Sequence, residues 1–122
     1  MLSITGEVIS GVGEFRVRMS NYLEQFESVL GHPVYPGTIN VLMDGELAIQ
    51  EDFRIEGTSI DEPNQDLLLE RCTINGVNAY RVRPLELDTG AGGHGDHVLE
   101  IICARYQPNC GAGEKVTVTF DR

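Results

Sequence analysis

Apolar and polar side chains alternate along several short segments of the chain, which is the pattern of strands with one buried face. This pattern predicts strands over residues 4–9, 38–43, 67–74, 77–85, 98–104 and 115–120. The run Glu14–Met19 alternates in the same way and predicts a further half-buried strand. Residues 88–96 hold four glycines and predict a flexible loop.

One segment follows the helical period instead. Between Ser20 and Leu30, apolar residues recur at three- and four-residue spacing and form one stripe around Phe26. Ser20 or Asn21 is the expected cap, Glu24 follows Asn21 by three positions, and Gly31 ends the helix. So short a helix is marginal in water, so we expect it to pack against the strands.

Two turn signals connect the strands. Asn75-Gly76 separates two predicted strands and is the strongest hairpin signal in the sequence, and Asp44-Gly45 follows the strand over residues 38–43. Six or more strands and one helix predict a mainly β fold, a small and mostly antiparallel β-barrel with one α-helix, because closing a sheet removes its exposed edges. We expect a single domain over residues 1–122.

Composition excludes several classes. The 122 residues carry 9 Lys+Arg against 19 Asp+Glu, a net charge of −10, which disfavours a nucleic-acid partner. No apolar run is long enough for a membrane span, and the N-terminus lacks the features of a secretory signal. Cys72, Cys103 and Cys110 form no C-x-x-C pair, so we expect no disulfide framework and no zinc knuckle. Cys72 and Cys103 are expected in the core, and the cytoplasm is the expected compartment.

Gly11-Val12-Gly13 is the first candidate for ligand binding. The P-loop pattern is absent, and the two glycines are only part of a dinucleotide-binding motif. On chemistry alone the segment is a tight turn between strands. The functional alternative is that its backbone N–H groups approach phosphates, with Arg16 adding positive charge.

The histidines and the paired carboxylates are weaker candidates. His94 and His97 flank Asp96 in a segment that could fold around a metal, but no matching distant ligand is evident, which favours a solvated loop. His32 is expected in a turn. The carboxylate pairs at residues 51–52 and 61–62 are expected to be solvated charges.

Thr38 and Asn40 are the most informative pair. In a strand they point to one face, while Ile39 and Val41 enter the core. Mg²⁺ takes oxygen ligands and is commonly completed by phosphates and water, so a hydroxyl and an amide could hold it. The alternative is that both side chains satisfy backbone groups of a turn.

The chain resembles the archaeal-type CTP-dependent riboflavin kinases over nearly its whole length. The specific part is Tyr35-Pro36-Gly37-Thr38-Ile39-Asn40, preceded by a predicted helix that ends in Leu30-Gly31. The resemblance also runs through residues 6–14, His94 and the run 98–102. It implies a six-stranded cradle-loop barrel that transfers the γ-phosphoryl group of CTP to riboflavin, giving FMN and CDP.

The resemblance also implies roles for individual residues. Thr38 and Asn40 would hold Mg²⁺, and Glu100 would contact the flavin side. Glu100 could also accept the hydroxyl proton, although a hydrogen bond to substrate is the simpler role. The nucleotide would lie along Gly11, Val12, Gly13, Glu14, Phe15 and Arg16. These roles fit phosphoryl transfer, which needs positioning and charge neutralisation.

The chain departs from the family pattern at three places. Phe15 stands where a third small glycine is usual, and Gly92-Gly93 replaces a threonine that Thr89 would have to supply. Arg105 is the one candidate for the basic stretch expected after the late strand. We therefore expect a CTP-dependent riboflavin kinase. The alternative is a barrel that binds flavin or nucleotide without turnover.

Overall fold

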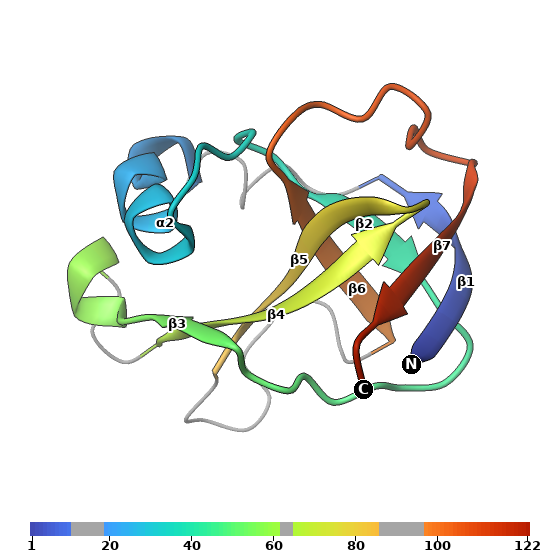
Figure 1. The fold of residues 1–122 in the computed structure, drawn as a ribbon, viewed down its shortest axis with the longest axis horizontal. Coiled ribbons are helices and arrows are strands. Elements are labelled where there is room, and N and C mark those ends of the chain that lie inside the picture. The colour runs from blue at the N-terminus through green and yellow to red at the C-terminus, as the bar shows by residue number, and fades with distance from the viewer. Residues whose placement is uncertain (11–18, 62–64, 86–96) are drawn as a thin grey trace.

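The chain forms a closed antiparallel β-barrel with a helix packed on its outside (Figure 1). The computed structural model describes residues 1–10, 19–61, 65–85 and 97–122. Its elements are β1 (Leu2–Ile9), α2 (Leu23–Leu30), β2 (Ile39–Leu42), β3 (Phe53–Ile55), the 3-10 helix η1 (Gly57–Ile60), β4 (Leu67–Ile74), β5 (Val77–Pro84), β6 (Val98–Cys103) and β7 (Lys115–Phe120). The barrel order is β4-β5-β6-β2-β1-β7, and β7 pairs back onto β4. The predicted mainly β, six-stranded barrel is confirmed.

The predicted hairpin is confirmed between β4 and β5. Asn75 and Gly76 both adopt positive φ, at 49° and 82°, as a two-residue hairpin turn of this kind requires. The Asn75 side chain also accepts a hydrogen bond from the backbone N–H of Thr117 at 2.9 Å. The turn is therefore tied to β7, next to the seam that closes the barrel.

The helix is confirmed at its end and corrected at its start. Gly31 has φ 81°, and its N–H donates to the carbonyl of Glu27 at 2.8 Å, so it terminates α2 as predicted. The predicted cap at Ser20 or Asn21 is wrong, because α2 follows Tyr22, which makes no side-chain capping bond.

Met19 also differs from expectation. The alternating pattern predicts Met19 at the end of a strand, but residues 19–21 are helical and Met19 is fully buried. Its apolar side chain packs in the cluster that contains Phe26, and this tertiary contact overrides the local alternation. The remainder of the predicted strand, residues 14–18, lies outside the described part of the chain, as does the predicted loop at residues 88–96.

Strand β3 and helix η1 were not predicted. β3 has three residues and pairs with the first half of β4, while the second half of β4 pairs with β7. A three-residue strand is too short to show an alternating pattern. Arg54, in the middle of β3, forms exposed ion pairs with Glu51 at 2.7 Å and with Asp66 at 3.2 Å.

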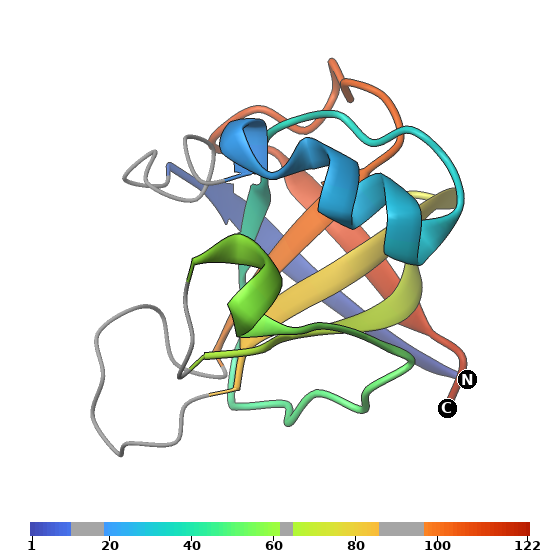
Figure 2. The same cartoon turned by 90° about the vertical axis from the view of Figure 1, so that its left-hand side faces the viewer.

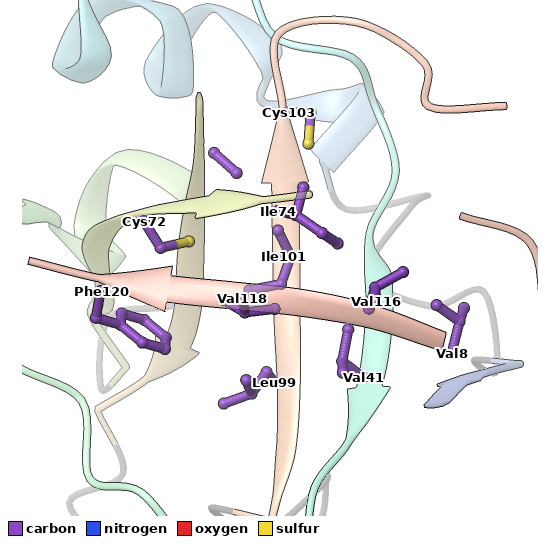
Figure 3. Packing of buried hydrophobic residues seen from close by; sticks show 11 residues of the cluster. Val8, Val41, Cys72, Ile74, Leu99, Ile101, Cys103, Val116, Val118 and Phe120 are labelled. Atoms are coloured by element: carbon purple, nitrogen blue, oxygen red, sulfur yellow. The ribbon is translucent and has the colours of Figure 1, made fainter. Parts of the chain in front are cut away.

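Two apolar clusters hold the fold together. The first fills the barrel: its buried residues are Val8, Val41, Cys72, Ile74, Ala79, Leu99, Ile101, Cys103, Val116, Val118 and Phe120, and Figure 3 shows side chains of this cluster between the strands. The second lies outside the barrel, where α2 crosses the strands (Figure 2), and includes Phe26, Leu69, Val82 and Ile102. Burial on both faces explains the long apolar runs of β4 and β6.

A buried carboxylate forms an ion pair on the face of β4 that also carries Cys72 and Ile74. Glu70 is only 3% exposed, and both of its carboxylate oxygens accept from the guanidinium of Arg122, each at 2.8 Å. The backbone N–H of Gln50 donates to the same carboxylate at 3.0 Å. Arg81, which pairs with Glu70 in the β4–β5 register, is also buried. Every oxygen of Glu70 therefore has a partner, which a buried carboxylate needs.

The cysteines are free thiols, as expected. Cys72 and Cys103 are buried in the barrel, and Cys110 is partly buried. Burial raises the pKa of Cys72 to about 12 and that of Cys103 to about 11. In the described ranges, no helix has the length and apolar character that a membrane span requires.

Candidate functional site

Strands β2 and β6 carry a polar pair on the outer face of the barrel. In the antiparallel register Asn40 lies opposite Glu100, with Ile9 of β1 next to Asn40 and Val82 of β5 next to Glu100. We call these four residues the outer row. Directly paired residues place their Cβ atoms about 5 Å apart on the same face. Since Val82 belongs to the cluster outside the barrel, the outer row faces α2 rather than the interior.

Thr38 extends this row in the direction of the chain. It precedes Asn40 by two positions, and Ile39 between them packs against the barrel interior. Thr38 and Asn40 therefore lie on the same side, as the alternation predicted. Figure 1 shows the chain entering β2 from the segment that follows α2.

Neither of these side chains has a hydrogen-bond partner among the described residues. Asn40 is nonetheless only 7% exposed. The oxygen and nitrogen of its amide still reach solvent, because neither is among the enclosed side-chain atoms that lack a partner. The amide is therefore open to a ligand at a residue that is otherwise mostly buried. The alternative that Thr38 and Asn40 satisfy backbone groups of a turn has no hydrogen bond to support it in this part of the chain.

The donor set fits a hard divalent cation. The donor set is the Thr38 hydroxyl and the Asn40 amide oxygen, which belong to one face, and the half-buried Glu100 lies opposite Asn40. Oxygen ligands with a low count of protein charges suit Mg²⁺, which keeps waters and phosphates as its other ligands. Within the described ranges there is no group of three or more His, Cys, Asp or Glu side chains that could hold a metal ion.

Arg105 lies at the same end of the barrel as Thr38. It is exposed and follows the end of β6, where the carbonyl of Cys103 accepts from the backbone N–H of Tyr35 at 2.9 Å. The next residue, Tyr106, packs its ring against that of Tyr35, with 5.5 Å between the ring centroids. The structure thus joins the segment after β6 to the segment before β2, although they are about 70 positions apart in the sequence.

The remaining candidates divide into two groups. Residues 11–16, Thr89, Gly92 and His94 lie outside the described residues, so their predicted roles stay predictions. His97 is described: it is exposed, immediately before β6, and its carbonyl accepts from the N–H of Met43. It stands three positions from Glu100 at the other end of β6 from Arg105, away from the polar pair.

Two polar features near the strands were missed by sequence reasoning. His32 was expected only as a turn residue, but its Nε2 lies 2.6 Å from the Tyr80 hydroxyl and its ring stacks on that of Tyr80. Because Nδ1 faces the Pro33 carbonyl, which can only accept, a neutral His32 accepts from Tyr80. The buried Glu70 was the other. The His32–Tyr80 contact and the Glu70–Arg122 contact join segments that are distant in the sequence, so no local pattern predicts them.

Comparison with known proteins finds a family model and several relatives. Residues 8–119 match a family model named CTP-dep_RFKase, with the description "Domain of unknown function DUF120". A protein of Thermofilum pendens named riboflavin kinase is 34% identical over 98% of this chain and 59% of its own length. One of Methanocorpusculum labreanum with the same name is 34% identical over 81% of this chain and 47% of its own.

The chain therefore spans between about half and three-fifths of the length of these two relatives. A shorter protein of Sulfurisphaera tokodaii, also named riboflavin kinase, is 27% identical over 87% of this chain and 83% of its own length. The family match covers most of the chain, including β2, β6 and the outer row. This chain belongs to the family of the CTP-dependent riboflavin kinase model.

Proposed function

We propose that this chain is a riboflavin kinase that transfers the γ-phosphoryl group of CTP to riboflavin, with Mg²⁺ bound at Thr38 and Asn40. The observation that carries the proposal is the side chain of Asn40, a residue only 7% exposed that lies opposite Glu100. Its amide has no hydrogen-bond partner among the described residues and remains accessible to a ligand. A structural asparagine at this depth would be hydrogen-bonded. An amide that binds a cation together with the phosphates of a ligand can lack such a hydrogen bond when the ligand is not bound.

The net charge explains why the reaction needs the cation. At −10 the chain repels a triphosphate, so positive charge has to be supplied where the phosphates bind. Thr38 and Asn40 would hold Mg²⁺ as neutral ligands, and the ion would supply positive charge beside the phosphates.

Glu100 acts on the acceptor side of the same site. In the transfer, the ribityl 5′-hydroxyl oxygen forms a bond to the γ-phosphorus while the bond from that phosphorus to the β–γ bridging oxygen breaks. CDP leaves with that oxygen, and the hydroxyl loses its proton. Glu100 positions the hydroxyl through a hydrogen bond and can accept this proton.

The other assignments complete the proposal. Residues 11–16 and Arg105 bind the nucleotide, and Thr89 binds the flavin side. Riboflavin and CTP are small-molecule partners, and nucleic acid is not one. Free, buried thiols suit a reducing compartment such as the cytoplasm. The Sulfurisphaera tokodaii relative supports a single catalytic domain over residues 1–122, because the aligned region spans most of its length.

The test is a direct assay of the unmodified protein. The protein is incubated with riboflavin, Mg²⁺ and each of CTP, ATP, GTP and UTP, and FMN is separated from riboflavin by chromatography. We expect FMN with CTP and none in the presence of a chelator. FMN with another nucleotide alone would overturn the donor assignment. No FMN from folded protein would favour the alternative, a barrel that binds its ligands without turnover.

A further inference from the structure

We propose that Tyr106 is the stacking platform for the pyrimidine base of the phosphoryl donor, an inference that rests on the proposed function of the outer row. The proposal starts from an unusual exposure. Among the Phe and Tyr side chains that the structure describes, only Tyr106 is more than half exposed, at 63%. A lone exposed ring would call for no explanation, but this one is held in place by its neighbours.

The ring of Tyr106 packs against the ring of Tyr35, which is fixed to the barrel. Its ring centroid lies 5.5 Å from that of Tyr35, and the two planes are inclined by 55°. This is within the usual range for a favourable aromatic pair. Tyr35 is itself anchored, because its backbone N–H donates to the Cys103 carbonyl at the end of β6. One face of Tyr106 is thereby left available to a flat ligand in a defined place.

That place adjoins the proposed metal site. The Tyr35 ring packs over Gly37, where an added Cβ would lie 3.4 Å from Cε1 of the ring. Gly37 is followed by Thr38, and Asn40 lies two positions further on. The contacts therefore run without a gap from Tyr106 through Tyr35 and Gly37 to Thr38. In a nucleoside triphosphate only the ribose and the α-phosphate separate the base from the phosphates that bind a metal ion, so a base on Tyr106 suits phosphates at Thr38.

The charge of Arg105 distinguishes the nucleotide from riboflavin as the ligand of Tyr106. Arg105 directly precedes Tyr106 and is exposed, and its carbonyl accepts from the Gln107 side chain at 3.1 Å, which ties the segment together. A ring with a guanidinium beside it suits a ligand that carries both a planar base and phosphates. Riboflavin has a planar ring but no negative charge, so it makes no use of Arg105. The structure thus favours the nucleotide as the occupant.

Tyr106→Ala and Tyr106→Phe form the matched pair that tests this. For Tyr106→Ala we expect the KM for CTP to rise about 5- to 20-fold, in the lower part of the range for base–aromatic stacking. Its kcat and the KM for riboflavin should stay within about twofold of the unmodified protein. Tyr106→Phe keeps the ring and should behave like the unmodified protein. Thermal unfolding of both variants checks that the fold is intact.

Calorimetric binding separates this proposal from the proposed function. With Mg²⁺ present, Tyr106→Ala should weaken CTP binding by the same factor but leave binding of inorganic triphosphate, which has no base, unchanged. If FMN never forms but this difference is seen, the base site stands and the kinase assignment falls. Equal CTP binding by Tyr106→Ala and the unmodified protein overturns the proposal, as does a change confined to riboflavin. Absence of CTP binding by the unmodified protein overturns it as well.

Discussion

The two faces of β2 and β6 differ in whether they carry apolar or polar side chains. Toward the barrel interior these strands present Val41, Leu99 and Ile101, all fully buried. Toward α2 the same strands present Asn40 and Glu100 in direct register. Adjacent residues of one strand thus serve two environments, because successive side chains point to opposite faces.

The contrast is sharper when two of the buried polar residues, Glu70 and Asn40, are compared. Glu70 is as buried as a core residue, and three donors satisfy its carboxylate. Asn40 is nearly as buried, and no described residue bonds to its side chain. A satisfied buried carboxylate contributes to the fold, whereas an amide that is bonded to no described residue and still reaches solvent contributes little to it. The difference indicates that Glu70 is structural and that Asn40 is kept for a ligand.

The largest effect is expected from Glu70→Gln. The substitution replaces one carboxylate oxygen by an NH2 group, which only donates and therefore cannot accept the hydrogen bond that Arg122 donates to that oxygen. Breaking one partner of a buried pair costs about 3–5 kcal/mol of the free energy of unfolding. Urea denaturation measures the loss, and we expect FMN formation per folded molecule to be preserved.

Glu51→Gln is the control for that variant. Glu51 pairs with Arg54 at 2.7 Å, but the two side chains are 38% and 39% exposed. An exposed pair of this kind contributes about 0–1 kcal/mol. If both substitutions cost the same, Glu70 does not have the structural role assigned to it.

A smaller loss is expected from Gly6→Ala, where β1 passes close to β2. A Cβ at Gly6 would lie 2.3 Å from the Leu42 carbonyl oxygen and 2.8 Å from Cγ1 of Val41. Overpacking costs about 1–3 kcal/mol, and here the obstacle is backbone, which yields little. Because β2 also carries Asn40, this change should lower both stability and FMN formation.

Gly111→Ala provides the matched control. A Cβ there meets no atom within 4 Å and the backbone has no positive φ, so we expect no measurable change in thermal unfolding. A Gly6→Ala protein as stable as Gly111→Ala would contradict the close approach of β1 and β2.

An effect that is absent near neutral pH concerns the thiols of the barrel interior. Burial raises the pKa of Cys72 from 9.0 to about 12. Between these values the unfolded chain loses a proton that the folded chain keeps, so stability is present below pH 9 and falls as the pH rises. The slope is about 1.4 kcal/mol per pH unit for one group.

Cys72→Ala removes this contribution. From pH 9 to 11 the unfolding free energy of the unmodified protein should fall more steeply than that of the variant, while below pH 8 the two should run parallel. Parallel curves over the whole range would mean that Cys72 is not buried as the structure shows.

Local signals predicted much of the fold. Asn75-Gly76 fixes the hairpin because few other residues accept positive φ at both positions, and β4 begins and ends where its apolar run does. The start of the helix was wrong because Tyr22 interrupts it without a side-chain cap. β3 was missed because its three residues are specified by pairing with β4 rather than by their own pattern.

The site was predictable only in part. Alternation alone places Thr38 and Asn40 on one face. That Glu100 lies opposite Asn40 depends on the pairing of β2 with β6, which no local pattern specifies. The contact of Tyr106 with Tyr35 has the same origin, because tertiary packing brings together two segments far apart in the sequence.

The central claim is that β2 is structural on one face and functional on the other, and two adjacent residues test it. Val41→Ala and Asn40→Ala are compared by urea denaturation and by FMN formation from riboflavin, CTP and Mg²⁺. Val41→Ala should lose about 2 kcal/mol of stability and keep its activity per folded molecule. Asn40→Ala should stay within about 1 kcal/mol in stability and lose at least about 100-fold in turnover. An Asn40→Ala protein that unfolds readily, or that turns over like the unmodified protein, would contradict the account.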